Sequence, residues 1–411
     1  MPWKETCAVE QRMRFVVEWE RGEVAVAVLC RQYGISRKTA YKWLKRFDEG
    51  SLAALADRRR APVAHPNRVE PEVERRIIEA RMAHPTWGPK KLRVVLERGA
   101  PDDRWPACST IGEILKRRGL VHPRRRRHRT PPYTEPFAAA DRPNAVWCAD
   151  FKGWFRTGDG SRCDPLTVTD AHSRYLLRCQ GLRETGFASV QPVFESVFRA
   201  HGLPWAIRTD NGAPFASRSV LGLSHLSVWW LKLGIRPERI EAGHPEQNGR
   251  HERMHLTLKQ ETACPPAGTL VGQQRRFARF VREYNEQRPH EALGMRTPSS
   301  RYEGSVRPYP RRVPEWEYPC GMSLRRVYDG GRFRWHCGQV FLSHVLDGEL
   351  VGLWSLDGRY HQVWLGPLAL GILDGQEARM LADREVRKLA SEGAIVCPSS
   401  FRCAPGARAD E

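Results

Sequence analysis

The sequence lacks the long apolar segment that a membrane-spanning helix requires. No run of about 18 apolar residues occurs anywhere in the chain, and the N-terminal stretch has no apolar core of the kind that a signal peptide carries. We therefore expect a cytoplasmic protein that has no membrane partner.

Paired cysteines are missing as well. The 11 cysteines are scattered singly, and none forms a Cys-x-x-Cys pair. An odd number at such spacings argues against a disulfide framework and against a zinc finger. We expect the thiols to be reduced and structural, as is usual in the cytoplasm.

Acidic residues are the third shortage. Lys and Arg total 67 against 47 Asp and Glu, which gives a formal net charge of +20. Such an excess indicates a polyanionic partner, with nucleic acid first and an acidic membrane surface second. The length of 411 residues predicts about two to four domains rather than one core.

Residues 1–60 have a helical pattern throughout. Three helices are expected, over residues 11–21, 23–32 and 36–48. Ser36 is a good N-cap for the third, and Gly34 suits the tight turn before it. The arrangement is typical of a helix-turn-helix domain, whose last helix enters the major groove. The side chains expected to contact DNA are Arg37, Lys38, Thr39, Tyr41, Lys42 and Lys45. A three-helix bundle with a solvated basic face is the alternative.

Residues 71–121 predict a second helical unit. Its helices are expected over residues 72–82, 90–97 and 110–118. The last would open with a Thr110-x-x-Glu113 capping box and end at Gly119. A second helix-turn-helix or winged DNA-binding module and a structural spacer both fit this pattern.

A basic linker over residues 122–143 follows. It contains four consecutive arginines, Arg124, Arg125, Arg126 and Arg127. Such a run is usually a solvated segment, but beside two candidate DNA-binding units we expect it to lie along a phosphate backbone.

Residues 144–302 alternate between strand and helix patterns, which predicts an α/β domain with a mixed sheet covered on both faces. In such sheets, sites lie at the carboxyl ends of the strands. Residues 316–385 contain short apolar runs separated by Asp-Gly turns, which predict a small β-barrel. Residues 392–411 predict a disordered tail.

Three acidic residues stand out in the α/β region. Asp150 lies inside a buried strand, where a carboxylate is costly unless a cation pairs with it. Asp210 follows the end of another strand, and Glu252 lies on a helix whose same face carries Leu256 and Lys259. Three carboxylates without an obligatory Cys or His ligand suit Mg²⁺ or Mn²⁺. Two such ions, about 3.5–4 Å apart, can clamp the oxygens of a phosphoryl displacement.

These acids stand in recognisable motifs. Asp150 in its strand, Thr209-Asp210-Asn211-Gly212, and His244-Pro245-x-x-Asn248-Gly249-x-x-Glu252-Arg253 with Leu258-Lys259 form one set. Tyr284-Asn285-x-x-Arg288-Pro289-His290 and Thr297-Pro298 form another. Together they resemble the DDE integrase core that insertion-sequence transposases and retroviral integrases share.

The resemblance implies a ribonuclease-H-like fold and a DNA transposase that cuts element ends and transfers them to target DNA. It implies that Asp150, Asp210 and Glu252 are catalytic and bind two ions, Mg²⁺ or Mn²⁺, and that Asn248 and Lys259 contact DNA. It further implies that the N-terminal helices bind the terminal inverted repeats, that the protein is a homo-oligomer, and that it is associated with a bacterial nucleoid. The zinc-binding N-terminal module of retroviral integrases is absent, so zinc is not expected.

Three alternatives stay open. The spacing from Asp210 to Glu252 is longer than usual for the family, which leaves Glu246 as a second candidate for the third acid. The segment His251-Glu252-x-x-His255 also spells the zinc-protease pattern. Finally, the chain could be a DNA-binding regulator with a catalytically silent core.

Overall fold

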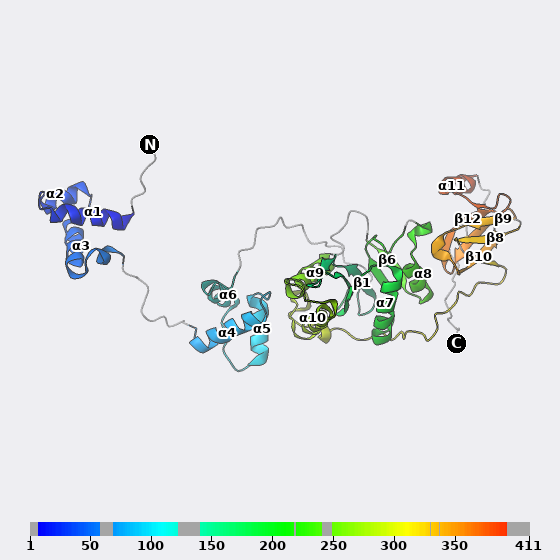
Figure 1. The fold of residues 1–411 in the computed structure, drawn as a ribbon, viewed down its shortest axis with the longest axis horizontal. Helices are drawn as coiled ribbons and strands as arrows, with labels where there is room; N and C mark the ends of the chain where they lie inside the picture. Colours follow the sequence, from blue (N-terminus) through cyan, green and yellow to red (C-terminus); the bar gives the residue numbers. More distant parts are fainter. Residues whose placement is uncertain are drawn as a thin grey trace. The chain divides into compact units, whose positions relative to one another are not determined.

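The computed structural model describes residues 7–57, 69–121, 140–217, 219–240, 249–328, 330–336 and 338–392. The chain divides into two compact units, Met1–Glu70 and Pro71–Glu411, whose elements are drawn in Figure 1. No helix among the described residues is long and apolar enough to cross a membrane.

The first unit is a three-helix arrangement. Its helices are α1 (Ala8–Glu20), α2 (Val26–Gln32) and α3 (Arg37–Gly50). Ser36 caps α3 by accepting a hydrogen bond from the Thr39 backbone N–H at 3.2 Å, and Gly34 has a φ of +62° in the turn before it. Both features were predicted. The predicted basic face of α3 is exposed apart from Thr39, which is half-buried.

Residues 71–121 form a second helical group. It contains α4 (Pro71–Ala83), α5 (Pro89–Gly99) and α6 (Cys108–Arg117). The predicted capping box is wrong, because α6 begins two residues earlier, after Ala107, which makes no side-chain cap. The earlier start places Cys108 one turn before the buried Ile111 and extends the apolar face of the helix. Gly119 does adopt a positive φ beyond the helix, as predicted.

The centre of the second unit is a six-stranded mixed sheet. Its strands are β1 (Val146–Phe151), β2 (Phe155–Arg156), β3 (Arg162–Asp170), β4 (Leu176–Leu182), β5 (Ala206–Thr209) and β6 (Arg236–Arg239). The path runs β2-β3-β1-β5-β6, and β4 also pairs with β3. β1, β3 and β4 pair antiparallel, whereas β1, β5 and β6 pair parallel. The prediction of a mixed sheet is confirmed.

Helices cover both faces of this sheet. Trp147, Ala149 and Ile207 belong to one apolar cluster with residues of α7 (Phe187–His201) and α8 (His225–Lys232). A second cluster joins residues of β3 and β4 to α9 (Gly249–Thr262) and α10 (Leu270–Arg282). Side chains alternate along a strand, so Cys148 and Asp150 point to the α9 side. Figure 1 shows α9 and α7 beside the strands.

The C-terminal part has a five-stranded sheet whose described edge strands do not pair, so the predicted small β-barrel is not confirmed. Five strands run in the order β13 (Arg379–Met380), β12 (Leu368–Asp374), β11 (Tyr360–Leu365), β10 (Leu350–Ser355) and β7 (Ser323–Arg326). A separate hairpin joins β8 (Arg332–Trp335) and β9 (Gly338–Phe341), and α11 (Asp383–Ser391) follows.

The apolar face of this sheet is covered by the β8–β9 hairpin and by residues in and just before α8, which belong to the same apolar cluster. Val351 and Leu353 of β10 pack in one cluster with Leu223 and Val228, which lie just before and within α8. A barrel must close on itself to remove its edges. Here other elements cover the apolar face, and the described edge strands β7 and β13 do not pair with each other. The predicted tail lies outside the described residues beyond position 392.

Candidate active site

Asp150 and Asp210 lie at corresponding positions of two neighbouring parallel strands. The ladder between β1 and β5 pairs Cys148 with Arg208, and two residues further along each chain stand the two acids. Parallel neighbours are about 4.8 Å apart, and residues two positions apart point to the same face. The register therefore predicts that the two acids lie near each other at the carboxyl ends of neighbouring parallel strands.

The carboxylate of Asp210 contains an unsatisfied acceptor. Its Oδ1 is buried and has no hydrogen-bond partner among the residues that the structure describes. The turn is fixed because Asn211 Nδ2 donates to the backbone oxygen of Ile240 at 3.0 Å. Position 212 must be small, since a Cβ on Gly212 would lie 3.0 Å from Asp210 Oδ2. A buried acceptor without a partner is costly, and a bound cation would remove that cost.

Glu252 lies on the first turn of α9, on its exposed side. Leu256 and Lys259 are exposed on the same side, as their spacing predicted. The opposite side is buried and carries His251, Met254, His255, Leu258 and Thr262. The far end of α9 is anchored by Glu261, which pairs with Arg288 at 2.9 Å and accepts a hydrogen bond from Thr86. Glu246 and Asn248 lie outside the described residues.

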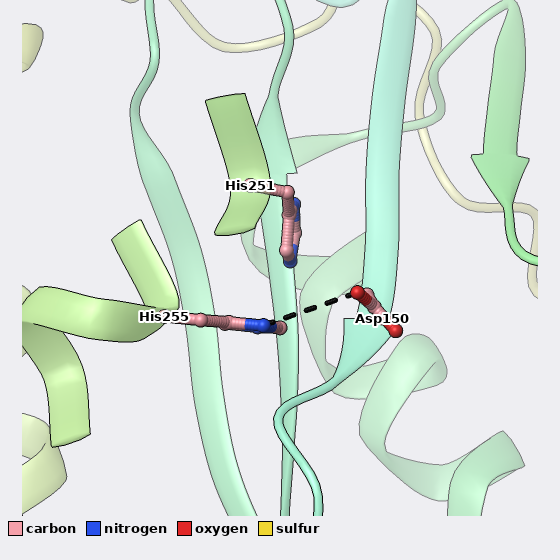
Figure 2. Close-up of side chains that lie close together, drawn as sticks. All are labelled: Asp150, His251 and His255. Carbon is pink, nitrogen blue, oxygen red and sulfur yellow. Dashed lines mark ion pairs between the residues drawn. The ribbon is translucent and has the colours of Figure 1, made fainter. Parts of the chain in front are cut away.

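Two histidines that sequence reasoning considered only as a protease pattern join α9 to the sheet. The Nε2 atoms of His251 and His255 lie 2.6 and 2.7 Å from Thr167 Oγ1. His251 Nδ1 lies 3.1 Å from Thr169 Oγ1. His255 Nδ1 lies 3.9 Å from Asp150 Oδ2, along the dashed line of Figure 2.

A signal for this network exists in the sequence. Thr167 and Thr169 are two positions apart in one strand, so they share a face. Two histidines at positions i and i+4 share a face of a helix. The sequence does not show that this face of α9 packs against this face of β3.

Burial keeps both imidazoles neutral. It lowers the pKa of His251 to about 3. Burial, followed by His251 and Lys152, lowers the pKa of His255 to about 2. At neutral pH neither ring carries a charge, so the negative charge of Asp150 is not neutralised by an imidazolium.

The donor set fits the metal that the acids predict. Asp150 and Asp210 offer hard carboxylate oxygens, which suit Mg²⁺ or Mn²⁺, and the orphaned Oδ1 of Asp210 is an acceptor that an ion would satisfy. Ligand atoms of Asp150, His251 and His255 also lie within 4.8 Å of one another. The site therefore combines carboxylates with a pair of neutral imidazoles.

The predicted DNA-binding side chains that the structure describes are solvent-accessible. On α3 they lie on one polar face, and Lys259 is exposed on α9. Arg124, Arg125, Arg126 and Arg127 lie outside the described residues.

The family models match this architecture along much of the chain. Residues 140–245 and 233–298 match models described as integrase core domains. Residues 11–62 match a helix-turn-helix domain, and residues 39–115 match a homeodomain-like domain. The central residues are therefore similar to integrase core domains and the N-terminal residues to helix-turn-helix domains, and these matches indicate the class of DDE-type polynucleotidyl transferases. This class replaces the zinc-protease alternative.

Similar proteins come from bacterial insertion elements. A 31.7 kDa protein of insertion element IS407 from Burkholderia multivorans is 28% identical over 68% of this chain and 91% of its own length. A 39.2 kDa protein of IS476 from Xanthomonas euvesicatoria is 27% identical over 70% of this chain and 81% of its own. Transposase InsD of IS2 from Escherichia coli is 24% identical over 52% of this chain and 72% of its own.

Solved structures similar to this chain include retroviral integrases. The HTLV-2 integrase catalytic core domain in complex with magnesium is 16% identical, covers 40% of this chain and 99% of its own, and has a TM-score of 0.32. A chain of the simian T-cell lymphotropic virus intasome in complex with PP2A regulatory subunit B56 gamma is 15% identical. It covers 72% of this chain and 90% of its own, with a TM-score of 0.36.

Proposed function

We propose that this protein is a DNA transposase that cuts DNA at the ends of a mobile element and joins the freed ends to target DNA. The observation that carries the proposal is that β1, which contains Asp150, pairs in parallel with β5, which Asp210 follows, within a region that matches an integrase core. The insertion-element relatives support DNA transposition as the general role.

The proposed reaction has two steps. In the first, water attacks a phosphodiester at the element's end, and the P–O3′ bond breaks to free a 3′-hydroxyl. In the second, that hydroxyl attacks a phosphodiester of the target, and a new P–O bond replaces the one that releases the target's own 3′-hydroxyl. The second step exchanges one phosphodiester for another, so it needs no energy source. No covalent intermediate with the enzyme is required.

The chain's residues hold and neutralise charge in this scheme. Asp150, Asp210 and Glu252 would hold two divalent ions, Mg²⁺ or Mn²⁺, with Asp150 shared between them. When bound, such ions neutralise phosphate charge and activate the attacking oxygen. The hydrogen bonds of His251 and His255 to Thr167 tie α9 to β3, and this fixes the helix that carries Glu252.

DNA is the proposed macromolecular partner. The polar face of α3 would read the terminal inverted repeats. Near the reacting end, phosphates would be contacted by Lys259, by the arginines at positions 124–127 and by Asn248. The positive side chains among them offset the charge of the backbone. Two element ends must be held together, so we propose a homo-oligomer that works at the nucleoid.

The proposal is tested with the element's terminal repeats on linear DNA, incubated with the full chain and Mg²⁺ or Mn²⁺. We expect end cleavage and strand transfer by the wild type. We expect both to fall by about 100-fold or more in Asp150→Asn, Asp210→Asn and Glu252→Gln, while repeat binding persists.

Asp159→Asn is the matched control. Asp159 lies in a turn where it accepts hydrogen bonds from Thr157 Oγ1 at 2.5 Å and the Ser161 backbone at 3.0 Å, so its variant should retain activity. Glu246→Gln decides between the two candidates for the third acid. A wild type that binds the repeats but neither cuts nor transfers them would overturn the proposal in favour of a DNA-binding regulator.

A further inference from the structure

The hydroxyl of Thr167 determines the protonation of both buried histidines. Thr167 Oγ1 contacts the Asp150 backbone oxygen at 3.1 Å and the Nε2 atoms of His251 and His255 at 2.6 and 2.7 Å. A threonine hydroxyl donates one hydrogen bond and accepts two. The carbonyl can only accept, so the hydroxyl donates to it. Both imidazoles must then donate Nε2–H to the hydroxyl oxygen for all three contacts to be satisfied.

This assignment leaves an unprotonated Nδ1 on each neutral ring, and the two nitrogens have different surroundings. His251 Nδ1 accepts from the hydroxyl of Thr169 at 3.1 Å. His255 Nδ1 faces Asp150 Oδ2 at 3.9 Å, as Figure 2 shows. At that distance the two atoms are not hydrogen-bonded, and both are electron-pair donors. The ligand atoms of Asp150, His251 and His255 lie within 4.8 Å of one another, which is close enough for one cation to contact both Nδ1 and Oδ2.

We propose that His255 Nδ1 and Asp150 Oδ2 together bind one divalent cation, with the imidazole as a nitrogen ligand beside the carboxylates. The proposal rests on the proposed function, because it assigns a further ligand to one of the ions of that site. Metal-binding histidines usually donate their other ring N–H to a protein acceptor, and Thr167 Oγ1 is that acceptor for His255.

The separation of the two atoms suits an ion. Bonds from nitrogen or carboxylate oxygen to such metals are about 2.0–2.2 Å long, so two of them span at most about 4.4 Å. The 3.9 Å between His255 Nδ1 and Asp150 Oδ2 falls within that span. His251 is excluded as a ligand, because both of its ring nitrogens already contact threonine hydroxyls.

A nitrogen ligand changes the preferred metal. Imidazole is a common ligand of transition-metal ions, whereas Mg²⁺ prefers carboxylate, carbonyl and water oxygens. The site should therefore bind Mn²⁺ more tightly than Mg²⁺. The side chain of Asp150 is 18% exposed whereas that of His255 is 7% exposed, so the ion would enter from the side of the carboxylate.

The test uses Mn²⁺ alone, bound to the full chain without DNA. Pulsed electron paramagnetic resonance detects a nitrogen nucleus that is bonded directly to Mn²⁺, and ¹⁵N-labelled histidine identifies its source. We expect nitrogen coupling in the wild type. In His255→Gln the coupling should vanish and Mn²⁺ affinity should fall about 10-fold or more, with a smaller loss for Mg²⁺.

His251→Gln is the matched control, because it removes a histidine of the same network that is not a proposed ligand, and it should keep the nitrogen coupling. Mn²⁺ bound to the wild type without histidine coupling would overturn the proposal, as would coupling that persists in His255→Gln. The wild-type spectrum by itself can overturn the proposal, so a variant that fails to fold does not block the test.

The outcome is separate from that of the proposed function. Strand transfer without nitrogen coupling would remove His255 from the ligands and leave the transposase proposal standing. Nitrogen coupling without strand transfer would keep His255 as a ligand and overturn the transposase proposal.

Discussion

At Thr167 one hydroxyl group joins a strand to a helix that is more than 80 residues away in the sequence. Thr167→Val keeps the side-chain shape and removes the hydroxyl, which leaves two buried imidazole N–H groups unsatisfied. We expect the free energy of unfolding to fall by about 1–3 kcal/mol. Denaturation by urea measures this change, followed by a probe of the second unit.

Thr167→Ser is the control for that change. Serine keeps the hydroxyl and loses only a methyl group, so most of the stability should return. If valine proves as stable as threonine, the hydroxyl does not hold α9 to the sheet.

His290 predicts a pH dependence of stability. Burial, followed by Lys91 and Arg288, lowers its pKa to about 3, whereas an unfolded histidine titrates near 6.5. As the pH falls below about 6.5, the unfolded chain binds a proton that the folded chain does not. The contribution is therefore complete above about 6.5 and is lost between about 6.5 and 3, at about 1.4 kcal/mol per pH unit.

Stability measured by denaturation across this pH range checks the sign. His290→Gln should reduce the slope of stability against pH between about 6.5 and 4, because its side chain does not titrate. His172→Gln alters an exposed histidine and serves as the comparison. Equal slopes in the wild type and His290→Gln would contradict the prediction.

Among the elements, α10 lies unusually close to β4. A Cβ at Gly181 would meet Cys163 Sγ at 3.0 Å, and Leu270 and Phe277 at 3.3 Å. These neighbours are buried or half-buried, so Gly181→Ala forces the helix away from the strand. We expect a loss of about 1–3 kcal/mol in the free energy of unfolding. Gly268→Ala adds the same methyl group where nothing lies within 4 Å, and it should leave the stability nearly unchanged in the same assay.

The elements that could be predicted were those with strong local signals. The N-cap at Ser36, the turn at Gly34 and the order of strands and helices around the central sheet follow from residue type and periodicity. The start of α6 could not be predicted from its capping pattern, because burial of the apolar face around Ile111 outweighed the cap at Thr110.

The candidate site divides in the same way. Asp150 and Asp210 could be named because one lies inside a recognisable buried strand and the other follows the end of a strand. The histidine and threonine contacts could not, since they depend on how α9 docks against β3. The predicted small barrel is not confirmed for a related reason: Asp-Gly turns predict hairpins, but they do not determine whether the edge strands β7 and β13 pair with each other.

At the scale of the whole molecule, the net charge of +20 predicts salt-dependent binding to the terminal repeats. Each phosphate contact contributes about 0.9 to the slope of log K against log salt concentration. Changing three exposed lysines of α3 together to glutamine should lower the slope by up to about 3. The three are Lys38, Lys42 and Lys45. Fluorescence anisotropy of a labelled repeat, titrated at several salt concentrations, measures it.

The control removes the same charge elsewhere. Arg384, Arg387 and Lys388 are exposed on α11, and their triple change to glutamine should leave the slope for the repeat nearly as it was. If both triple variants lower the slope equally, total charge governs binding and α3 has no special part in it.

The parallel ladder between β1 and β5 also has an evolutionary consequence. Asp150 lies in β1 and Asp210 directly follows β5, and these two strands are hydrogen-bonded to each other. Loops in the chain between them can therefore be gained or lost without changing the distance between the two carboxylates. The position of Glu252 is not fixed by backbone hydrogen bonds to the sheet, because α9 contacts the sheet through side chains. Related sequences should therefore tolerate insertions between Asp150 and Asp210. Changes on the buried side of α9 should occur only together with changes at Thr167 and Thr169, which contact it.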